Sequence, residues 1–214
     1  MTAGLVVLLF VAWQLWWTDV EANGDQQQTV TQLEEAFESP DPTAASVHPA
    51  DPAVPAEAFA IVRIPRFGED YARPVLEGTG QDILAQGLGH YPETTGPGEV
   101  GNFAVAGHRT TWGRPLHDVE LLEVGDTVIV ETKEAFDVYA VRSSEIVDPT
   151  YGAAIAPVPD AVGEEPTSAW LTLTTCHPKY SAQQRFIVHA ELVQSYPRAD
   201  GIPPSVLTDP TWKA

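Results

Sequence analysis

Residues 170–178, WLTLTTCHP, decide how the second half of the chain is interpreted. The run from Trp170 to Thr175 is rich in β-branched and aromatic residues, a composition that favours a β-strand. Pro178 ends the pattern, because proline has no N–H group to donate in a central strand. Cys176 is therefore expected at the end of a strand, where a loop begins and a thiol is accessible.

A second strand is predicted nine residues after Cys176, over residues 185–192, and Arg185 opens it. If the two strands are neighbours, Cys176 and Arg185 lie near the same end of the sheet. A fixed positive charge beside a thiol favours the thiolate, which is the nucleophilic form. Arginine also offers a planar fork of donors to an oxyanion. This pattern favours a reactive cysteine, and the alternative is an inert cysteine that packs as a small hydrophobe.

The rest of this region shows the same sequence pattern, in which short apolar runs are separated by Gly and Pro. Such runs predict further strands, and many short strands are typical of a closed or nearly closed β-barrel. The additional strands are expected at residues 59–64, 102–107, 126–131 and 136–141, with a short helix at 82–88 and a helical turn within 115–122. The fold class is therefore mainly β.

A cysteine nucleophile needs a proton partner, and His108 is the best placed of the six histidines. It follows the predicted strand 102–107 and precedes three polar residues, as a side chain at the rim of a barrel does. From its position alone His108 can also be a structural residue. The other five are expected to be structural or inert: His48, His90, His117, His177 and His189. Among them, His177 adjoins the cysteine, but neighbouring strand residues point to opposite faces.

These segments together resemble those of the sortase family. Residues 172–176, TLTTC, resemble the sortase signature TLxTC, and Arg185 follows at the family's distance. Residues 106–109, AGHR, look like the family's histidine segment. The resemblance covers about residues 59–194, and the extensions around Cys176 and His108 are most similar to class E sortases of high-GC Gram-positive bacteria.

The resemblance implies an eight-stranded sortase-type β-barrel with a membrane anchor before it. It implies a transpeptidase that cleaves a C-terminal LAXTG or LPXTG-like sorting signal between Thr and Gly through a thioester on Cys176. The acyl group then passes to a peptidoglycan-precursor amine of the lipid II type. His108 is the implied proton donor and Arg185 the oxyanion stabiliser. Thr175 and Tyr91 are candidates for substrate contact, and neither a cofactor nor a metal is expected.

Three alternatives remain at this point. A secreted cysteine peptidase would use the same cysteine and histidine with water as the acceptor. A non-catalytic surface module would keep the cysteine for structure. An L,D-transpeptidase also pairs cysteine with histidine, but it usually has glycine before the cysteine, where this chain has Thr175.

The amino-terminal segment indicates in which cellular compartment the protein lies. Residues 3–17 form an apolar run of fifteen residues with Gln14 as its one polar member, and Trp13, Trp16 and Trp17 end it. A helix of this length spans roughly 22 Å against a hydrocarbon core of about 30 Å. The run predicts a single-pass anchor with the catalytic domain on the extracellular side, and a cleaved signal peptide or a buried helix are the alternatives.

Four regions follow from these observations: a membrane anchor at 1–21, an extended stalk rich in Pro, Ala and acidic residues at 22–57, the catalytic domain at 58–194 and a polar tail at 195–214.

Thirty acidic and eleven basic side chains give a formal net charge of −19. Binding to phosphate backbones requires clustered Lys and Arg, so a nucleic acid partner is not expected. The expected partners are the membrane, surface proteins with a sorting signal and the peptidoglycan precursor.

Overall fold

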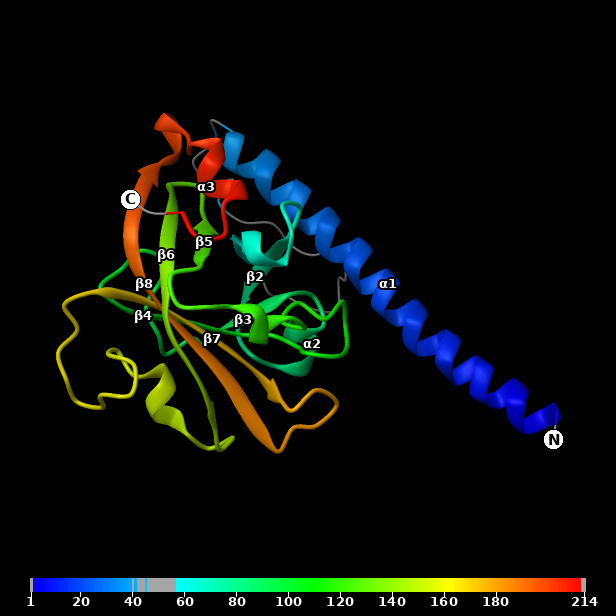
Figure 1. Cartoon of the computed structure of the whole chain (residues 1–214). Coiled ribbons are helices and arrows are strands. Elements are labelled where there is room, and N and C mark those ends of the chain that lie inside the picture. Colours follow the sequence, from blue (N-terminus) through cyan, green and yellow to red (C-terminus); the bar gives the residue numbers. More distant parts are fainter. Residues whose placement is uncertain (1, 40, 42–44, 46–56, 213–214) are drawn as a thin grey trace.

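The computed structural model describes residues 2–39, 41, 45 and 57–212. Its central feature is a closed barrel with the strand order β1-β2-β3-β4-β7-β8-β6-β5 (Figure 1). The strands are β1 (Ala58–Arg63), β2 (Ala72–Glu77), β3 (Leu88–His90), β4 (Gly101–Ala106), β5 (Thr127–Glu131), β6 (Ala135–Val147), β7 (Ala169–His177) and β8 (Gln184–Pro197). The predicted eight-stranded β-barrel is therefore confirmed.

The barrel interior is filled by one apolar cluster to which alternate residues of each strand contribute. Phe103 and Val105 of β4, Leu171 and Leu173 of β7, and Val188 of β8 are all buried within it. Because strand side chains alternate between the two faces, the intervening residues point to the outer face of the barrel. Thr172, Thr174 and Cys176 of β7 therefore share that outer face, as do Arg185 and His189 of β8.

Two strands were not predicted from the sequence, namely β2 and β3. Strand β2 carries Pro74 at its centre, and β3 is three residues long with Gly89 in its middle. Both features weaken a strand pattern in the sequence. The predicted helix at 82–88 is shorter in the structure, as α2 (Gln81–Leu84), and the predicted turn within 115–122 contains the 3₁₀ helix η2 (Val119–Leu121).

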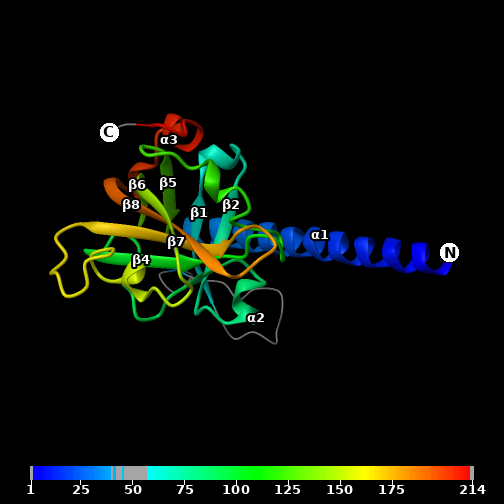
Figure 2. The ribbon, with the colours of Figure 1, turned by 60° about the horizontal axis from the view of Figure 1, so that its bottom comes forward.

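A single long helix, α1 (Thr2–Glu38), occupies most of the region before the barrel. Its second half lies against β1 and β2, and its first half projects away from the barrel (Figures 1 and 2). In the contact region Val30, Leu33 and Phe37 pack with buried side chains of the barrel, including Ile61 and Leu76. Among the described residues, no helix is both long enough and apolar enough to cross a membrane.

The expectation of an extended stalk from residue 22 is wrong for residues 22–38, which are helical and packed. Burying apolar side chains of α1 against the barrel offsets the entropy of ordering this segment. The remainder of the predicted stalk, with His48, lies outside the described residues except for Ser39, Asp41, Ala45 and Glu57.

The predicted polar tail is also more ordered than expected. Strand β8 continues to Pro197, and the short helix α3 (Pro204–Thr208) follows. Val206 of α3 is fully buried against Ile129, Phe136 and Val138 of the barrel. The tail therefore packs against β5 and β6 of the barrel and is not a loosely attached segment.

Candidate active site

The positions of Cys176 and Arg185 are fixed by the antiparallel pairing of β7 with β8. In this register Cys176 stands directly opposite Arg185. Directly opposed side chains of an antiparallel pair lie on the same face, with Cβ atoms about 4.5–5.5 Å apart. Cys176 is a free cysteine, and its side chain is half-buried. The thiol and the guanidinium thus start from adjacent points on the outer face of the barrel.

His108 reaches the same rim through the parallel pairing of β4 with β7. The register ends at Ala106 opposite Thr174, and the Gly107 N–H donates to the Thr174 carbonyl at 3.0 Å. His108 and Cys176 are each two residues beyond this last pair. The structure therefore brings the three sequence-predicted residues, from three separate strands, to one rim.

The segment that carries His108 is held closely to β7. The Thr175 hydroxyl donates to the Gly107 carbonyl at 2.7 Å, and Thr175 is buried. Gly107 has no room for a side chain, because a Cβ there would lie 2.6 Å from Leu88 Cδ2 and 3.0 Å from Leu116. Thr175 faces inward, away from Cys176, so its contact is with the histidine segment.

Tyr91 lies on the outer face beside the nucleophile's strand. Its hydroxyl is 3.0 Å from the hydroxyl of Thr174, which shares the outer face with Cys176. Tyr91 is half-buried, so part of its ring is available to a ligand that lies along β7.

Arg109 belongs to the histidine segment at residues 106–109, but its sequence position predicts no role for it. Its guanidinium is buried and donates from Nη1 to the Cys176 carbonyl and toward His177 Nδ1, each at 3.1 Å. Nη2 donates to Glu120 at 2.6 Å, and Glu120 also pairs with Lys179 at 2.6 Å. Arg109 directly follows His108 in the chain. Its hydrogen bond to the Cys176 carbonyl therefore holds the histidine segment against the backbone of the nucleophile. A buried arginine can only be located from contacts between distant segments, so no sequence signal identified it.

The local environment changes the protonation of two groups in this region. Partial burial lowers the pKa of His108, because desolvation disfavours the imidazolium. Its Nε2 is buried and has no hydrogen-bond partner within the described part of the chain. Desolvation would raise the pKa of Glu120, but its bonds with Lys179 and Arg109 outweigh it and bring that pKa to about 2. Glu120 thus stays ionised and keeps its two cationic partners in place.

Arg185 is less constrained than Arg109. Its Nη1 donates to the carbonyl of Ala182, just before β8, and to the carbonyl of Gln184, the first residue of β8, both at 3.1 Å. These bonds involve one end of the guanidinium and leave the other donors of the fork available for an anionic group.

A barrel with an outer-face cysteine, flanked by a histidine and an arginine from adjacent strands, defines a cysteine-dependent enzyme of the sortase type. The family model of the sortase domain matches residues 62–193. The chain belongs to the sortase family, whose members are cysteine transpeptidases.

Among its relatives, sortase SrtE1 of Streptomyces coelicolor is 33% identical over 216 residues, which cover 97% of this chain and 59% of that protein. The structure of sortase E from Streptomyces avermitilis is 41% identical with a TM-score of 0.63, covering 70% of this chain and 96% of that one. The crystal structure of sortase E1 from S. coelicolor, with a tripeptide in its active site, is 35% identical with a TM-score of 0.63 over 68% and 94% of the chains. The predicted likeness to class E sortases is confirmed.

Proposed function

We propose that this chain is a transpeptidase that cleaves a C-terminal sorting signal of the LAXTG or LPXTG type between Thr and Gly. The acyl fragment is carried as a thioester on Cys176 and transferred to an amine of a peptidoglycan precursor. The observation that carries the proposal is the strand register: Arg185 is opposed to Cys176, and His108, two residues past the end of β4, is level with Cys176. The related S. coelicolor enzyme, which holds a tripeptide in its active site, supports a peptide substrate.

The first half of the reaction forms the thioester. The Cys176 thiolate attacks the threonyl carbonyl carbon, and the oxygen becomes an oxyanion that Arg185 stabilises. Protonated His108 donates its proton to the glycine nitrogen as the C–N bond breaks. This step releases the glycine-side peptide with a free amine and leaves the acyl fragment on Cys176 as a thioester. Tyr91, beside Thr174, is proposed to line the path of the substrate.

The second half transfers the acyl group. The incoming amine attacks the thioester carbonyl and loses a proton to His108, which is neutral after the first step. The carbon–sulfur bond then breaks, and the Cys176 thiolate is regenerated. Thr175 is proposed to act indirectly, by holding the carbonyl of Gly107 and so the position of His108.

The proposal is tested with an LAXTG peptide and a small amine. The transpeptidase produces an amide whose yield rises with amine concentration, and Cys176→Ala abolishes it. A hydrolase would release only the acid at every amine concentration. A non-catalytic module would consume no peptide and would tolerate Cys176→Ala without any measurable change.

We further propose that the start of α1 attaches the enzyme to the membrane from the extracellular side. Large apolar side chains are exposed along this part of the helix: Leu5, Val6, Val7, Leu9, Phe10, Trp13 and Trp17. Exposed apolar surface of this extent is typical of an interaction site. Flotation with lipid vesicles should carry the chain upward, and the double change Leu9→Glu and Phe10→Glu should leave it at the bottom of the gradient.

A further inference from the structure

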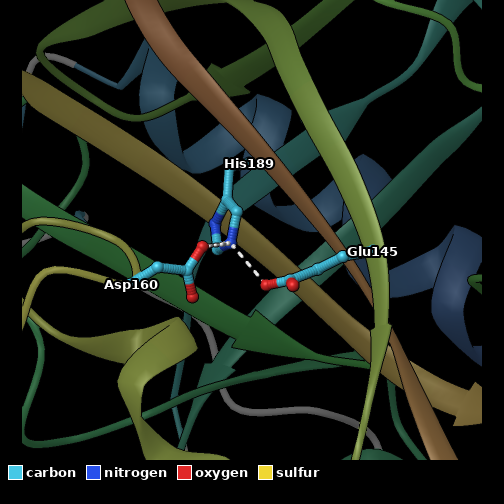
Figure 3. A group of neighbouring side chains, drawn as sticks. All are labelled: Glu145, Asp160 and His189. Atoms are coloured by element: carbon cyan, nitrogen blue, oxygen red, sulfur yellow. Dashed lines mark ion pairs between the residues drawn. The ribbon is translucent and has the colours of Figure 1, made fainter.

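Away from the thiol, three titratable side chains converge on the outer face of the barrel (Figure 3). His189 comes from β8, Glu145 from β6, and Asp160 from the connection between η3 (Gly152–Ile155) and β7. His189 Nε2 lies 3.3 Å from Asp160 Oδ2 and 3.7 Å from Glu145 Oε1. All three potential ligand atoms lie within 4.8 Å of one another.

A buried chain of hydrogen bonds sets the tautomer of His189. The Asn102 amide nitrogen donates to the carbonyls of Ala154 and Ala156 at 3.2 and 2.9 Å, so its oxygen is the acceptor. The Thr172 hydroxyl donates to that oxygen at 2.8 Å, and its own oxygen is then free to accept from His189 Nδ1 at 2.9 Å. With its proton on Nδ1, the neutral imidazole presents a bare lone pair at Nε2.

This lone pair is directed at two other acceptors. His189 is 2% exposed, and its Nε2 has no hydrogen bond within the described part of the chain. Glu145 Oε1 is likewise buried without a hydrogen bond there. Within the described residues, no donor lies between His189 Nε2 and Glu145 Oε1, whereas Asp160 also interacts with the Tyr151 hydroxyl. Facing acceptors repel, so this arrangement requires a cation or an extra proton.

A single extra proton could bridge only two of the three ligand atoms, and it would leave the third acceptor unpaired. A bound cation would satisfy all three groups at once.

We propose that Glu145, Asp160 and His189 bind one divalent transition-metal ion, with Zn²⁺ as the best match. Ligands about 2.0–2.2 Å from a tetrahedral zinc lie roughly 3.3–3.6 Å from one another. The two distances to His189 Nε2, 3.3 and 3.7 Å, are close to this range. The hydrogen bond from Nδ1 to Thr172 is the kind of outer contact that orients a metal-binding histidine.

The composition of the site selects against the harder cations. Ca²⁺ takes about six to eight oxygen ligands and Mg²⁺ prefers about six, whereas imidazole nitrogen suits Zn²⁺ and related ions. Three protein ligands leave one tetrahedral position for water. The sequence expectation of no metal differs from this proposal because the ligands lie 15 and 29 residues apart and form no recognisable spacing.

The site would fasten the loop between β6 and β7 to the barrel wall. Asp160 is the only one of the three ligands in that loop, whereas Glu145 and His189 belong to strands. Thr172 and His189 are directly paired, four residues along β7 and β8 from the pair of Cys176 and Arg185. Four residues of strand span about 13 Å. The ion would therefore order a loop beside the active site without touching the reacting atoms.

The test uses the untagged chain after treatment with a chelator and dialysis. Isothermal titration with Zn²⁺ should give one ion per chain, and Zn²⁺ should raise the melting temperature. The double variant Glu145→Gln/Asp160→Asn should bind at least about 30-fold more weakly, since changing even an outer contact of a metal site costs roughly 10–100-fold. Glu164→Gln, which removes one exposed charge from the same loop, is the matched control and should bind like the original chain.

Circular dichroism and melting of every variant in chelator show whether it folds. If the double variant does not fold, the single variant Glu145→Gln and the visible absorption of bound Co²⁺ provide the same comparison. The proposal is overturned if no Zn²⁺ binds, if binding is the same in the Glu145 variant, or if Ca²⁺ or Mg²⁺ binds as tightly. None of these readouts depends on transpeptidase activity.

Discussion

The Arg109 guanidinium donates a hydrogen bond to the backbone carbonyl of Cys176 at a distance of 3.1 Å. This contact joins the residue after His108 to the nucleophile, so the two halves of the site share one buried cation. Arg109 also donates to Glu120, and Glu120 pairs with Lys179, which extends the connection to the loop that follows β7. The geometry of the site thus depends on a residue that need not touch the substrate.

Replacing Arg109 with Ala should therefore reduce both stability and activity. Removing a buried charged donor leaves the Cys176 carbonyl and Glu120 with fewer partners, at a cost of about 2–3 kcal/mol in the free energy of unfolding. We expect kcat/KM to fall at least about ten-fold because the two site segments separate. Chemical denaturation and peptide cleavage measure the two effects. The control is Arg142→Ala, which breaks a largely exposed pair with Glu191 and should lower the free energy of unfolding by less than about 1 kcal/mol. If both changes lowered the free energy of unfolding equally, Arg109 would not have this structural role.

Replacing Arg185 with Ala should affect chemistry more than folding. Losing one oxyanion donor typically lowers kcat about 10²–10³-fold. Arg185 is only half-buried, so the melting temperature should change little. Steady-state kinetics should show the loss in kcat, with Gln184→Ala as the neighbouring control of near-normal rate. A variant with raised KM and unchanged kcat would instead assign Arg185 to ground-state binding.

Replacing Thr175 with Val keeps its volume but removes the hydroxyl. The Gly107 carbonyl then loses its 2.7 Å hydrogen bond, at a cost of about 1–3 kcal/mol. We expect a lower kcat with little change in KM, because His108 is displaced while the outer face is intact. Thr174→Val, which removes the contact with Tyr91, should instead raise KM. If Thr175→Val raises KM alone, Thr175 contacts the substrate.

The lowered pKa of His108 has a consequence for stability at mildly acidic pH. The unfolded chain has a histidine pKa near about 6.5, above that of folded His108, so it binds the proton more readily. Stability should therefore fall as the pH drops from about 7.5 through 6.5. His108→Gln should remove part of this slope. Urea unfolding of both proteins at several pH values measures it, and parallel slopes would refute the assigned burial of the imidazole.

The sequence indicated the barrel because its strands are compact β-branched runs, and it indicated the site because the segments around His108 and Cys176 resemble known ones. It could not show that β4 and β7 are paired. They are parallel and distant in sequence, and only this pairing makes His108 level with Cys176. The contacts of Arg109 depend on the same pairing, which explains why it received no role.

The helical packing of α1 escaped prediction for a different reason. Its buried side recurs at helical spacing over residues 22, 26, 29, 30, 33 and 37, but Gln26 and Thr29 interrupt the apolar pattern. Each of these two polar members makes a specific hydrogen bond: Gln26 donates to the Trp112 carbonyl at 3.0 Å and Thr29 to the Asp25 carbonyl at 3.0 Å. A hydrophobicity pattern alone does not reveal such bonds.

The central claim is that the thiol of Cys176 takes up the acyl group of a sorting-signal peptide with the help of His108 and Arg185. Intact-protein and peptide mass spectrometry after mixing the chain with an LAXTG peptide tests it directly. The account predicts a mass increase equal to the LAXT acyl fragment, located on Cys176, lost on addition of an amine and reduced in His108→Gln and Arg185→Ala. The absence of an adduct while the peptide is being cleaved, or an adduct at another residue, would contradict it.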